Sequence, residues 1–345
     1  MTIIIFILIL GAIIFVHEFG HFLFAKANGV YVYEFALGMG PRIISKKGKE
    51  TTYSLRLIPI GGFCQLAGED TVADEKEDIP KDRTLQAKKP WQRFLIMFFG
   101  AGFNFLFAII LLFSIALFCG STSYKPIVNS VDKDLPAYQV GIKKGDIVKR
   151  IGNHKVHTVD DISLYLTLAN PKKATKIVVL RNGKEITYRV KPKKVTEEDN
   201  EVYRYGLGLN TKKQHGLINA ISYTYHKTGS IFRQMFVTLK ALFTGGIKLN
   251  QLSGPVGIYS IVGEQSKDGL ASLLYLTAFL SINVGFINLL PLPAFDGGHI
   301  LFIIIEKIKG SPVKPETENM IHTVGLFLLM ALMVYITFND ILKLF

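Results

Sequence analysis

The stretch His17-Glu-Phe-Gly-His21 lies inside the first long apolar segment of the chain, and this position constrains the protein more than any other feature. Residues 2–16 are uncharged and almost entirely apolar, and residues 22–25 continue the run. Ionisable side chains are costly within a membrane span, so those found there are candidates for function. Helical residues four apart share one face. Two histidines at this spacing can bind one Zn²⁺, and Glu18 between them is a candidate general base.

The composition predicts a protein with several membrane spans. Hydrophobic residues make up 49% of the 345-residue chain, and its mean hydropathy is +0.31. A hydrocarbon core about 30 Å thick is crossed by a helix of about 20 apolar residues. Four segments are long enough or nearly so: residues 2–25, 94–119, 270–290 and 324–338, the last extending toward residue 345.

The charge distribution predicts an orientation. Basic residues follow the first span rather than precede it, beginning with Lys26 and Arg42. The positive-inside tendency therefore places the N-terminus outside the cytoplasm, residues 26–93 inside and residues 120–265 outside. The net charge of +13 has no nucleic-acid-binding motif beside it. We expect a surface near anionic lipid and no nucleic-acid partner.

Between the first two spans, residues 53–60 begin with strand-like alternation, and glycines nearby imply turns. Leu55 and Leu57 belong to this segment. We expect a hairpin that dips toward the bilayer. An edge strand there could hold a peptide in an extended conformation by β-augmentation, with these two leucines as substrate contacts.

Residues 124–195 indicate a small α+β domain. Strand candidates at 126–131, 177–180 and 185–190 accompany a turn into a strand at 141–148 and helical spacing at 160–168. Asn182-Gly183 is a strong signal for a type I′ hairpin. The order resembles a PDZ domain. Residues 215–248, which mix aromatic and basic residues, predict either an amphipathic helix at the membrane interface or a helix packed on this domain.

A catalytic zinc site needs a third protein ligand in addition to two histidines. Asp296 is an isolated acid at the end of the third span, where prolines at 291 and 293 prevent a regular helix. Broken helices at membrane depth are tolerated where they line a cavity. Asp296 is therefore the best candidate. His299 competes with it, although it also fits as a polar residue that starts the next helix.

Two amides inside apolar segments, Asn104 and Asn288, have two interpretations each. They either form interhelical hydrogen bonds or hold a substrate carbonyl.

Taken together, the chain resembles the site-2 protease family of intramembrane zinc metalloproteases, in particular the bacterial branch with an extracytoplasmic PDZ domain. The resemblance runs nearly end to end. It rests on six stretches: residues 17–26, 34–41, 58–63, 252–258, 288–298 and 339–341. One departure is Gly100-Ala101-Gly102, which lacks the proline that the family usually has before the residue matching Asn104.

The resemblance implies a polytopic α-helical membrane protein with about four transmembrane helices, a membrane-associated β-hairpin and one inserted PDZ-like α+β domain. It divides the chain into a membrane region (1–119), an extracytoplasmic PDZ-like domain (120–214), an amphipathic interfacial segment (215–265) and a second membrane region (266–345). His17, His21 and Asp296 match the family's Zn²⁺ ligands, and Glu18 matches its general base.

The implied activity is hydrolysis of a peptide bond within or near the transmembrane segment of a single-span membrane protein, such as an anti-sigma factor or a signal-peptide remnant. The implied location is the inner membrane of a bacterium, with the active site near the cytoplasmic side. A non-catalytic PDZ scaffold would not need Glu18. A zinc transporter would need several acid and histidine pairs along a path, and the sequence shows one cluster.

Overall fold

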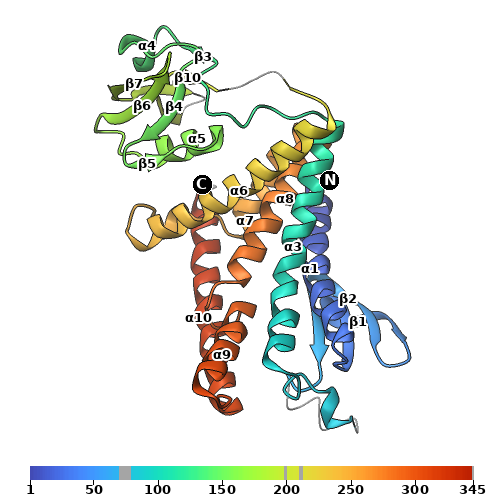
Figure 1. The fold of residues 1–345 in the computed structure, drawn as a ribbon. Coiled ribbons are helices and arrows are strands. Elements are labelled where there is room, and N and C mark those ends of the chain that lie inside the picture. The colour runs from blue at the N-terminus through green and yellow to red at the C-terminus, as the bar shows by residue number, and fades with distance from the viewer. Residues whose placement is uncertain (70–78, 198–199, 210–212, 344–345) are drawn as a thin grey trace. The chain divides into compact units, whose positions relative to one another are not determined.

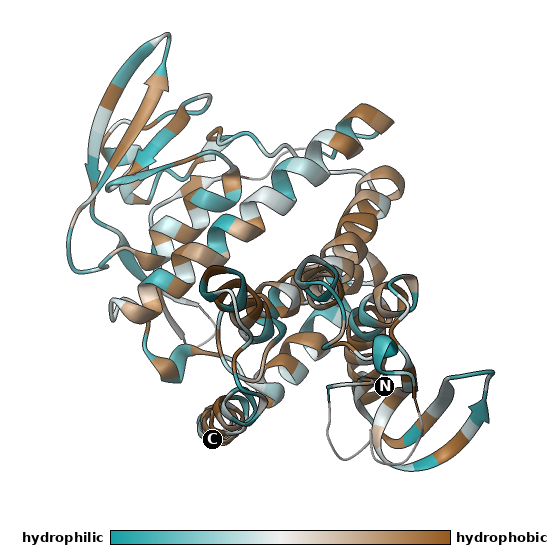
Figure 2. Ribbon diagram, turned by 60° about the horizontal axis from the view of Figure 1, so that its bottom comes forward, coloured by the Kyte–Doolittle hydropathy of each residue, from teal (hydrophilic) through white to brown (hydrophobic). Residues whose placement is uncertain are grey.

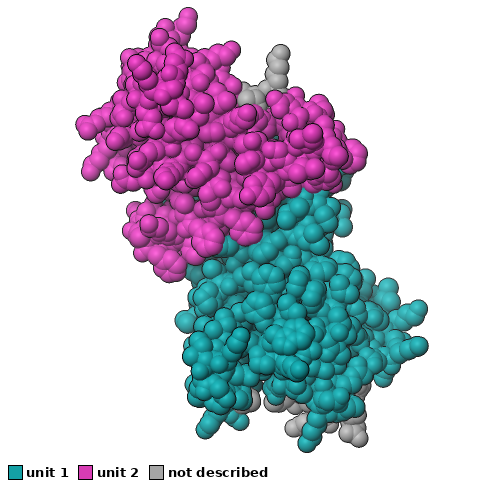
Figure 3. Space-filling view, in the orientation of Figure 1, with its two compact units in different colours: residues 1–111, 249–345 teal, residues 112–248 magenta. Residues whose placement is uncertain are grey.

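The computed structural model describes residues 1–69, 79–197, 200–209 and 213–343 (Figure 1). The chain forms two compact units (Figure 3). The first comprises residues 1–111 and 249–345, and the second comprises residues 112–248.

Within the described residues, four helices are long and apolar enough to cross a membrane, as the sequence predicts. They are α1 (Thr2–Ala27), α3 (Pro90–Phe118), α8 (Leu270–Asn288) and α10 (Pro315–Leu342). The fourth helix begins at Pro315, whereas the apolar run in the sequence begins near residue 324. The two starts differ because Glu316 and Glu318 in the first turn lower the local hydropathy but do not break the helix. Proline at the first helical position and acids in the first turn both favour a helix start.

These helices consist largely of apolar residues, and their ribbons are mostly brown in Figure 2. On α10, Phe327, Leu328 and Val334 are 67%, 68% and 70% exposed. A soluble protein rarely exposes a continuous apolar surface of this kind, so the exposed rows fit contact with lipid.

Small residues bring the helices of the first unit close together. A Cβ at Gly20 would lie 2.1 Å from the Phe99 carbonyl oxygen, and one at Gly285 would lie 3.0 Å from that of Ala101. Only glycine therefore fits where α1 and α8 meet α3. Ser281 also donates a hydrogen bond to the Asn104 carbonyl.

The end of α10 anchors another helix, α7 (Pro255–Lys267). Asp340 Oδ2 accepts hydrogen bonds from the backbone N–H groups of Gly254 and Gly257, at 2.7 and 2.8 Å. These donors have no partner within their own helix. Asp340 is thus an N-terminal cap supplied by a different helix.

Strands β1 (Val32–Lys47) and β2 (Thr52–Leu66) form more than a simple hairpin. Residues 34–37 pair with 52–55 on one side and with 62–65 on the other. Both strands therefore fold back, with left-handed glycines such as Gly38 and Gly61 at the bends. The four segments lie in the order 42–47, 52–56, 34–37, 62–66. The expectation of a free edge over 53–60 is wrong for residues 53–55, which have partners on both sides.

A buried ionic cluster holds this sheet together. Glu34 is 4% exposed and accepts hydrogen bonds from Arg42, Arg56 and Ser54. Burial raises the pKa of the Glu34 carboxyl, but these donors outweigh burial and lower the pKa to about 2. Glu34 is therefore ionised at neutral pH and links segments that are distant along both strands.

The second unit contains a four-stranded antiparallel sheet in the order β5-β4-β6-β7. The bounds are β4 (Ile147–Ile151), β5 (His154–Lys155), β6 (Thr175–Arg181) and β7 (Lys184–Val190). The type I′ turn is confirmed, because Asn182 and Gly183 have φ of 50° and 77°. The helix expected at 160–168 is α5 (Val159–Leu168).

Shorter elements complete this unit. They are β3 (Ser130–Val131) paired with β10 (Leu207–Gly208), β8 (Lys193–Glu197) paired with β9 (Asn200–Arg204), and α4 (Pro136–Gln139). The sequence-based prediction contains no counterpart of β8, β9 or β10. Arg181 forms a salt bridge with Asp146, which is 1% exposed. Burial alone would raise the pKa of the Asp146 carboxyl, but its bonds to Arg181 and the Lys143 N–H lower it.

Helix α6 (Leu217–Phe243) packs on this domain with one face. Thr158 donates a hydrogen bond to Ser230, and Lys227 forms a salt bridge with Asp160. The opposite face exposes Ile218 (82%) and Tyr225 (76%). One face of α6 therefore packs on the domain, which is one of the two alternatives expected from the sequence. The other face is apolar and exposed, as a helix at the membrane interface would require.

Candidate metal centre

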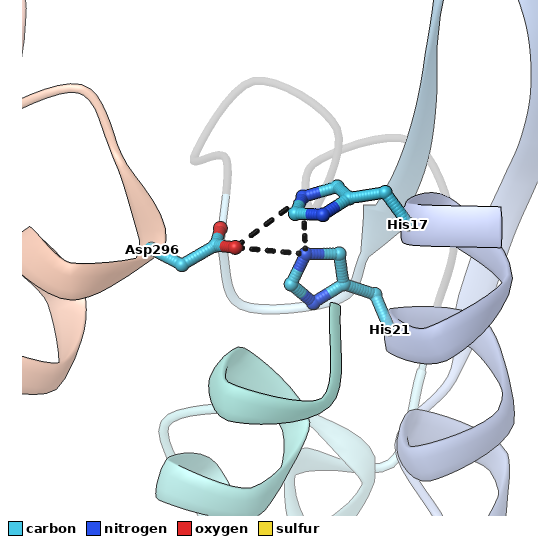
Figure 4. A group of neighbouring side chains, drawn as sticks. All are labelled: His17, His21 and Asp296. Atoms are coloured by element: carbon cyan, nitrogen blue, oxygen red, sulfur yellow. Dashed lines mark hydrogen bonds and ion pairs between the residues drawn. The ribbon is translucent and has the colours of Figure 1, made fainter. Parts of the chain in front are cut away.

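Three side chains from two separate elements converge in the first unit (Figure 4). His17 and His21 lie one turn apart on α1, and Asp296 is the first residue of α9 (Asp296–Lys309). The two Nε2 atoms are 3.2 Å apart, and Asp296 Oδ2 lies 3.3 Å from the first and 3.4 Å from the second. The structure thus brings together two histidines and an acid almost 280 residues later.

These distances fit a tetrahedral Zn²⁺ site. Bonds of about 2.0–2.1 Å at tetrahedral angles place neighbouring ligand atoms about 3.3 Å apart. Asp296 Oδ2 is buried, and the two Nε2 atoms that it approaches offer it no hydrogen when each imidazole carries its proton on Nδ1. A buried carboxylate oxygen without a partner is costly unless a cation satisfies it. The donor set and its spacing therefore suit zinc.

The surroundings of His21 leave its Nε2 lone pair free for a metal. Its Nδ1 lies 2.9 Å from the Ile96 carbonyl oxygen, an acceptor, so Nδ1 carries the proton. Gly100 makes room for the ring, because a Cβ there would lie 2.2 Å from His21 Nε2. The sequence suggested only that small residues near 100–102 allow close helix packing, and it gave no sign of this contact with the histidine.

His17 is oriented by amides. Asn104 is 0% exposed, and its side-chain nitrogen lies 3.3 Å from His17 Nδ1. The Asn104 Oδ1 atom is buried without a partner. Rotating this amide by half a turn would let Oδ1 accept the Nδ1–H of His17 and free Nε2 for a metal. Asn288 approaches His17 Nε2 itself, at 3.4 Å.

The loop that carries Asp296 is tightly folded. Prolines interrupt the chain between α8 and α9, and the second and third residues of α9 are buried glycines. A Cβ at Gly297 would lie 2.1 Å from the Leu290 carbonyl oxygen, and one at Gly298 would lie 2.6 Å from that of Leu292. The helix start can therefore approach the preceding turn only because both positions are glycine.

A cavity of about 690 Å³ opens onto these three side chains. Glu18 lines it, as do the folded sheet and Met97. The sheet contributes residues 63–66 of its edge segment together with the ionic cluster of Glu34, Arg42 and Arg56. A Cβ at Gly62 would lie 3.5 Å from Glu18 Cγ. A carboxylate, the ligand set and a strand edge thus share one cavity.

Other residues singled out from the sequence lie elsewhere. Leu55 and Leu57 are 45% and 60% exposed and do not line this cavity. His299 contacts Glu318, with Nδ1 and Oε1 3.2 Å apart. His322 of α10 stacks on His299 with ring centroids 4.0 Å apart. The i, i+4 spacing of Glu318 and His322 was the only sequence signal for this second cluster.

Comparison with known proteins identifies the family of the chain. The sequence pattern of Peptidase family M50 matches residues 5–332. A putative zinc metalloprotease of Clostridium perfringens is 38% identical over 345 residues, covering 99% of both chains. The regulator of sigma-W protease RasP of Bacillus subtilis is 32% identical over 420 aligned positions, covering 100% of this chain and 99% of the relative. The resemblance drawn from the sequence is confirmed: the chain belongs to peptidase family M50 and is a zinc metalloprotease of the membrane.

Proposed function

We propose that His17, His21 and Asp296 hold the zinc ion and that Glu18 is the general base for hydrolysis of a peptide bond at membrane depth. The observation that carries this proposal is the set of three ligand atoms 3.2–3.4 Å apart, in a cavity that Glu18 also lines. Zinc, when bound there, polarises the scissile carbonyl and makes water acidic enough to attack near neutral pH.

Side chains of the protein transfer the proton, orient His17 and bind the substrate carbonyl. Glu18 takes the proton from the attacking water and delivers it to the leaving amine. Asn104 orients His17, because a fully buried amide against Nδ1 is placed to fix the ring and cannot touch a substrate. Asn288 is only partly buried and approaches His17 Nε2, the atom that would bind the metal, so it is the amide assigned to hold the substrate carbonyl.

The substrate binds as an extended strand along residues 62–66. A peptide bond inside a helix is shielded, so the substrate must unwind before attack. Residues 62–66 form an edge of the folded sheet, and residues 63–66 line the cavity. Edge strands offer unpaired backbone groups to an incoming peptide. The segment that includes Leu55 is interior and cannot provide this edge.

We expect a photo-crosslinking amino acid in place of Phe63 to capture a single-span substrate more strongly than the same amino acid in place of Leu57. The Glu18→Gln background keeps the substrate intact during irradiation. The yield of crosslinked substrate on a denaturing gel is the measurement. Equal yields at both positions, or a higher yield at Leu57, would contradict substrate binding along 62–66.

The second unit is a PDZ-type domain that lies outside the cytoplasm. Its strand order, its type I′ hairpin and α5 support this assignment. A cavity of about 960 Å³ lies between α5 and the β3–β10 pair and is open enough for an extended peptide. The basic residues after α1 support an intracellular position for the folded sheet.

This orientation predicts the accessibility of two exposed lysines, Lys47 and Lys184. In cells expressing the Cys119→Ser background, Lys184→Cys should react with a membrane-impermeant thiol reagent, and Lys47→Cys should react only after permeabilisation. The opposite pattern would invert the topology.

The substrates proposed are single-span membrane proteins. The name of the Bacillus relative refers to regulation of sigma-W, which favours an anti-sigma factor as one substrate class for this chain as well. A bacterial inner membrane is the matching location.

A further inference from the structure

We propose that His322 on α10 is a positioning residue for Asp296: it accepts the Ala294 backbone N–H and fixes the turn from which Asp296 reaches the metal. This inference rests on the proposed role of Asp296 as a ligand. It adds a residue from the fourth membrane helix to a site built by α1, α3 and α9.

The turn before Asp296 has an unfavourable backbone. Ala294 has φ of 71°, in the left-handed region. This conformation is sterically unfavourable for a residue other than glycine. It persists only where the surrounding structure holds it. Ala294 lies two residues before Asp296, so a change in its φ would move the carboxylate.

His322 supplies the contact that holds this turn. The Ala294 N–H donates to His322 Nδ1, with a nitrogen–nitrogen distance of 3.1 Å. The imidazole is fixed in turn, because it stacks on His299 at an interplanar angle of 14° and His299 contacts Glu318. The histidine is therefore held in one orientation from both sides.

One face of α10 packs against this turn. Glu318, His322 and Gly325 have i, i+4 and i+7 spacing, so they line one side of the helix. A Cβ at Gly325 would lie 2.2 Å from Pro293 Cβ. The glycine lets α10 press against the proline just before Ala294.

The potential ligand atoms of His299, Glu318 and His322 lie within 4.8 Å of one another, so this cluster is a candidate for a second metal site. The hydrogen bond to Ala294 decides against this role. A neutral imidazole that accepts at Nδ1 carries its proton on Nε2. The Nε2 atom is buried without a partner and has no lone pair to offer a metal. The cluster as folded therefore positions the loop.

Two variants distinguish the effect of the hydrogen-bond acceptor at Nδ1 from the effect of ring packing. His322→Phe keeps a ring that can stack on His299 but removes the acceptor. His322→Asn places an amide oxygen the same number of bonds from Cα as Nδ1. Zinc affinity is measured on purified full-length protein by competition with a chromophoric chelator, and the absorption of bound Co²⁺ reports the coordination geometry. Thr323→Ala, at the exposed neighbouring position, is the matched control.

We expect His322→Phe to lower zinc affinity about tenfold, the lower end for loss of a residue that supports a ligand. His322→Asn should stay within about threefold of wild type, as expected if the single hydrogen bond survives. Adding Ala294→Gly to His322→Phe should restore most of the affinity, because glycine adopts a positive φ without the steric cost. The Co²⁺ spectrum should change in His322→Phe and recover in the double variant.

Three outcomes would overturn the proposal. The first is wild-type zinc affinity in His322→Phe. The second is equal loss in His322→Asn with no rescue by Ala294→Gly, which would assign the effect to packing. The third is loss of a second zinc equivalent with the first retained, which would make the cluster a metal site. Zinc binding by Asp296→Ala, measured in parallel, distinguishes failure of the ligand assignment for Asp296 from failure of the positioning role of His322. Retained zinc there refutes the ligand assignment, whereas loss of zinc there with no change in His322→Phe refutes only the positioning role.

Discussion

Glu18→Gln should abolish measurable cleavage while leaving zinc bound. Glutamine keeps the shape of the side chain but cannot accept a proton, and general acid–base catalysis contributes about 10²–10⁴-fold to rate. Glu18 lines the cavity beside the proposed ligands, and it does not belong to the group His17, His21 and Asp296 whose spacing among the described residues suits a metal ion. The measurement is cleavage of a single-span substrate by purified protein in detergent, together with metal analysis of the same sample.

Glu264→Gln is the matched control, because Glu264 is an exposed acid on α7. It should cleave at the wild-type rate. Normal turnover by Glu18→Gln would refute the general-base role. Loss of zinc together with activity would show that Glu18 is needed to hold the metal.

Asp296→Ala should lose both zinc and activity. It removes one of the three proposed ligands, and a site reduced to two histidines falls short of the ligand number found in catalytic zinc centres. Removing residues that merely support a ligand costs about 10–100-fold in affinity, so loss of the ligand should cost about 100-fold or more. Zinc affinity and substrate cleavage are measured on the same preparation.

Asp268→Ala, at an exposed acid, provides the control for expression and folding. Full zinc content in Asp296→Ala would require another third ligand. His299 would be examined first, since it lies on the same helix.

Local patterns in the sequence predicted much of the membrane region. The i, i+4 histidines could be assigned to one helix face, because α-helical geometry fixes that relation without tertiary information. Asp296 could be singled out because prolines at 291 and 293 break the span just before it. The Asn182-Gly183 turn was predictable for the same local reason, since both residues tolerate positive φ.

Features that depend on non-local contacts were not predictable. The alternation near Leu55 indicates a strand but does not say how many partners that strand has, and the fold-back of β1 and β2 makes it interior. Gly100 is one small residue among several until its contact with His21 is known. His322 has no sequence neighbour that points to Ala294, which lies on a different element. Hydropathy also missed the start of α10, because charges in a first turn resemble a loop.

The most direct test of the central claim is the zinc content of wild-type protein, Glu18→Gln and Asp296→Ala, purified in parallel without added metal. If His17, His21 and Asp296 hold the catalytic zinc and Glu18 acts only on protons, the first two should contain about one zinc per chain and the third should contain almost none. One zinc per chain in Asp296→Ala, or none in Glu18→Gln, would contradict the account.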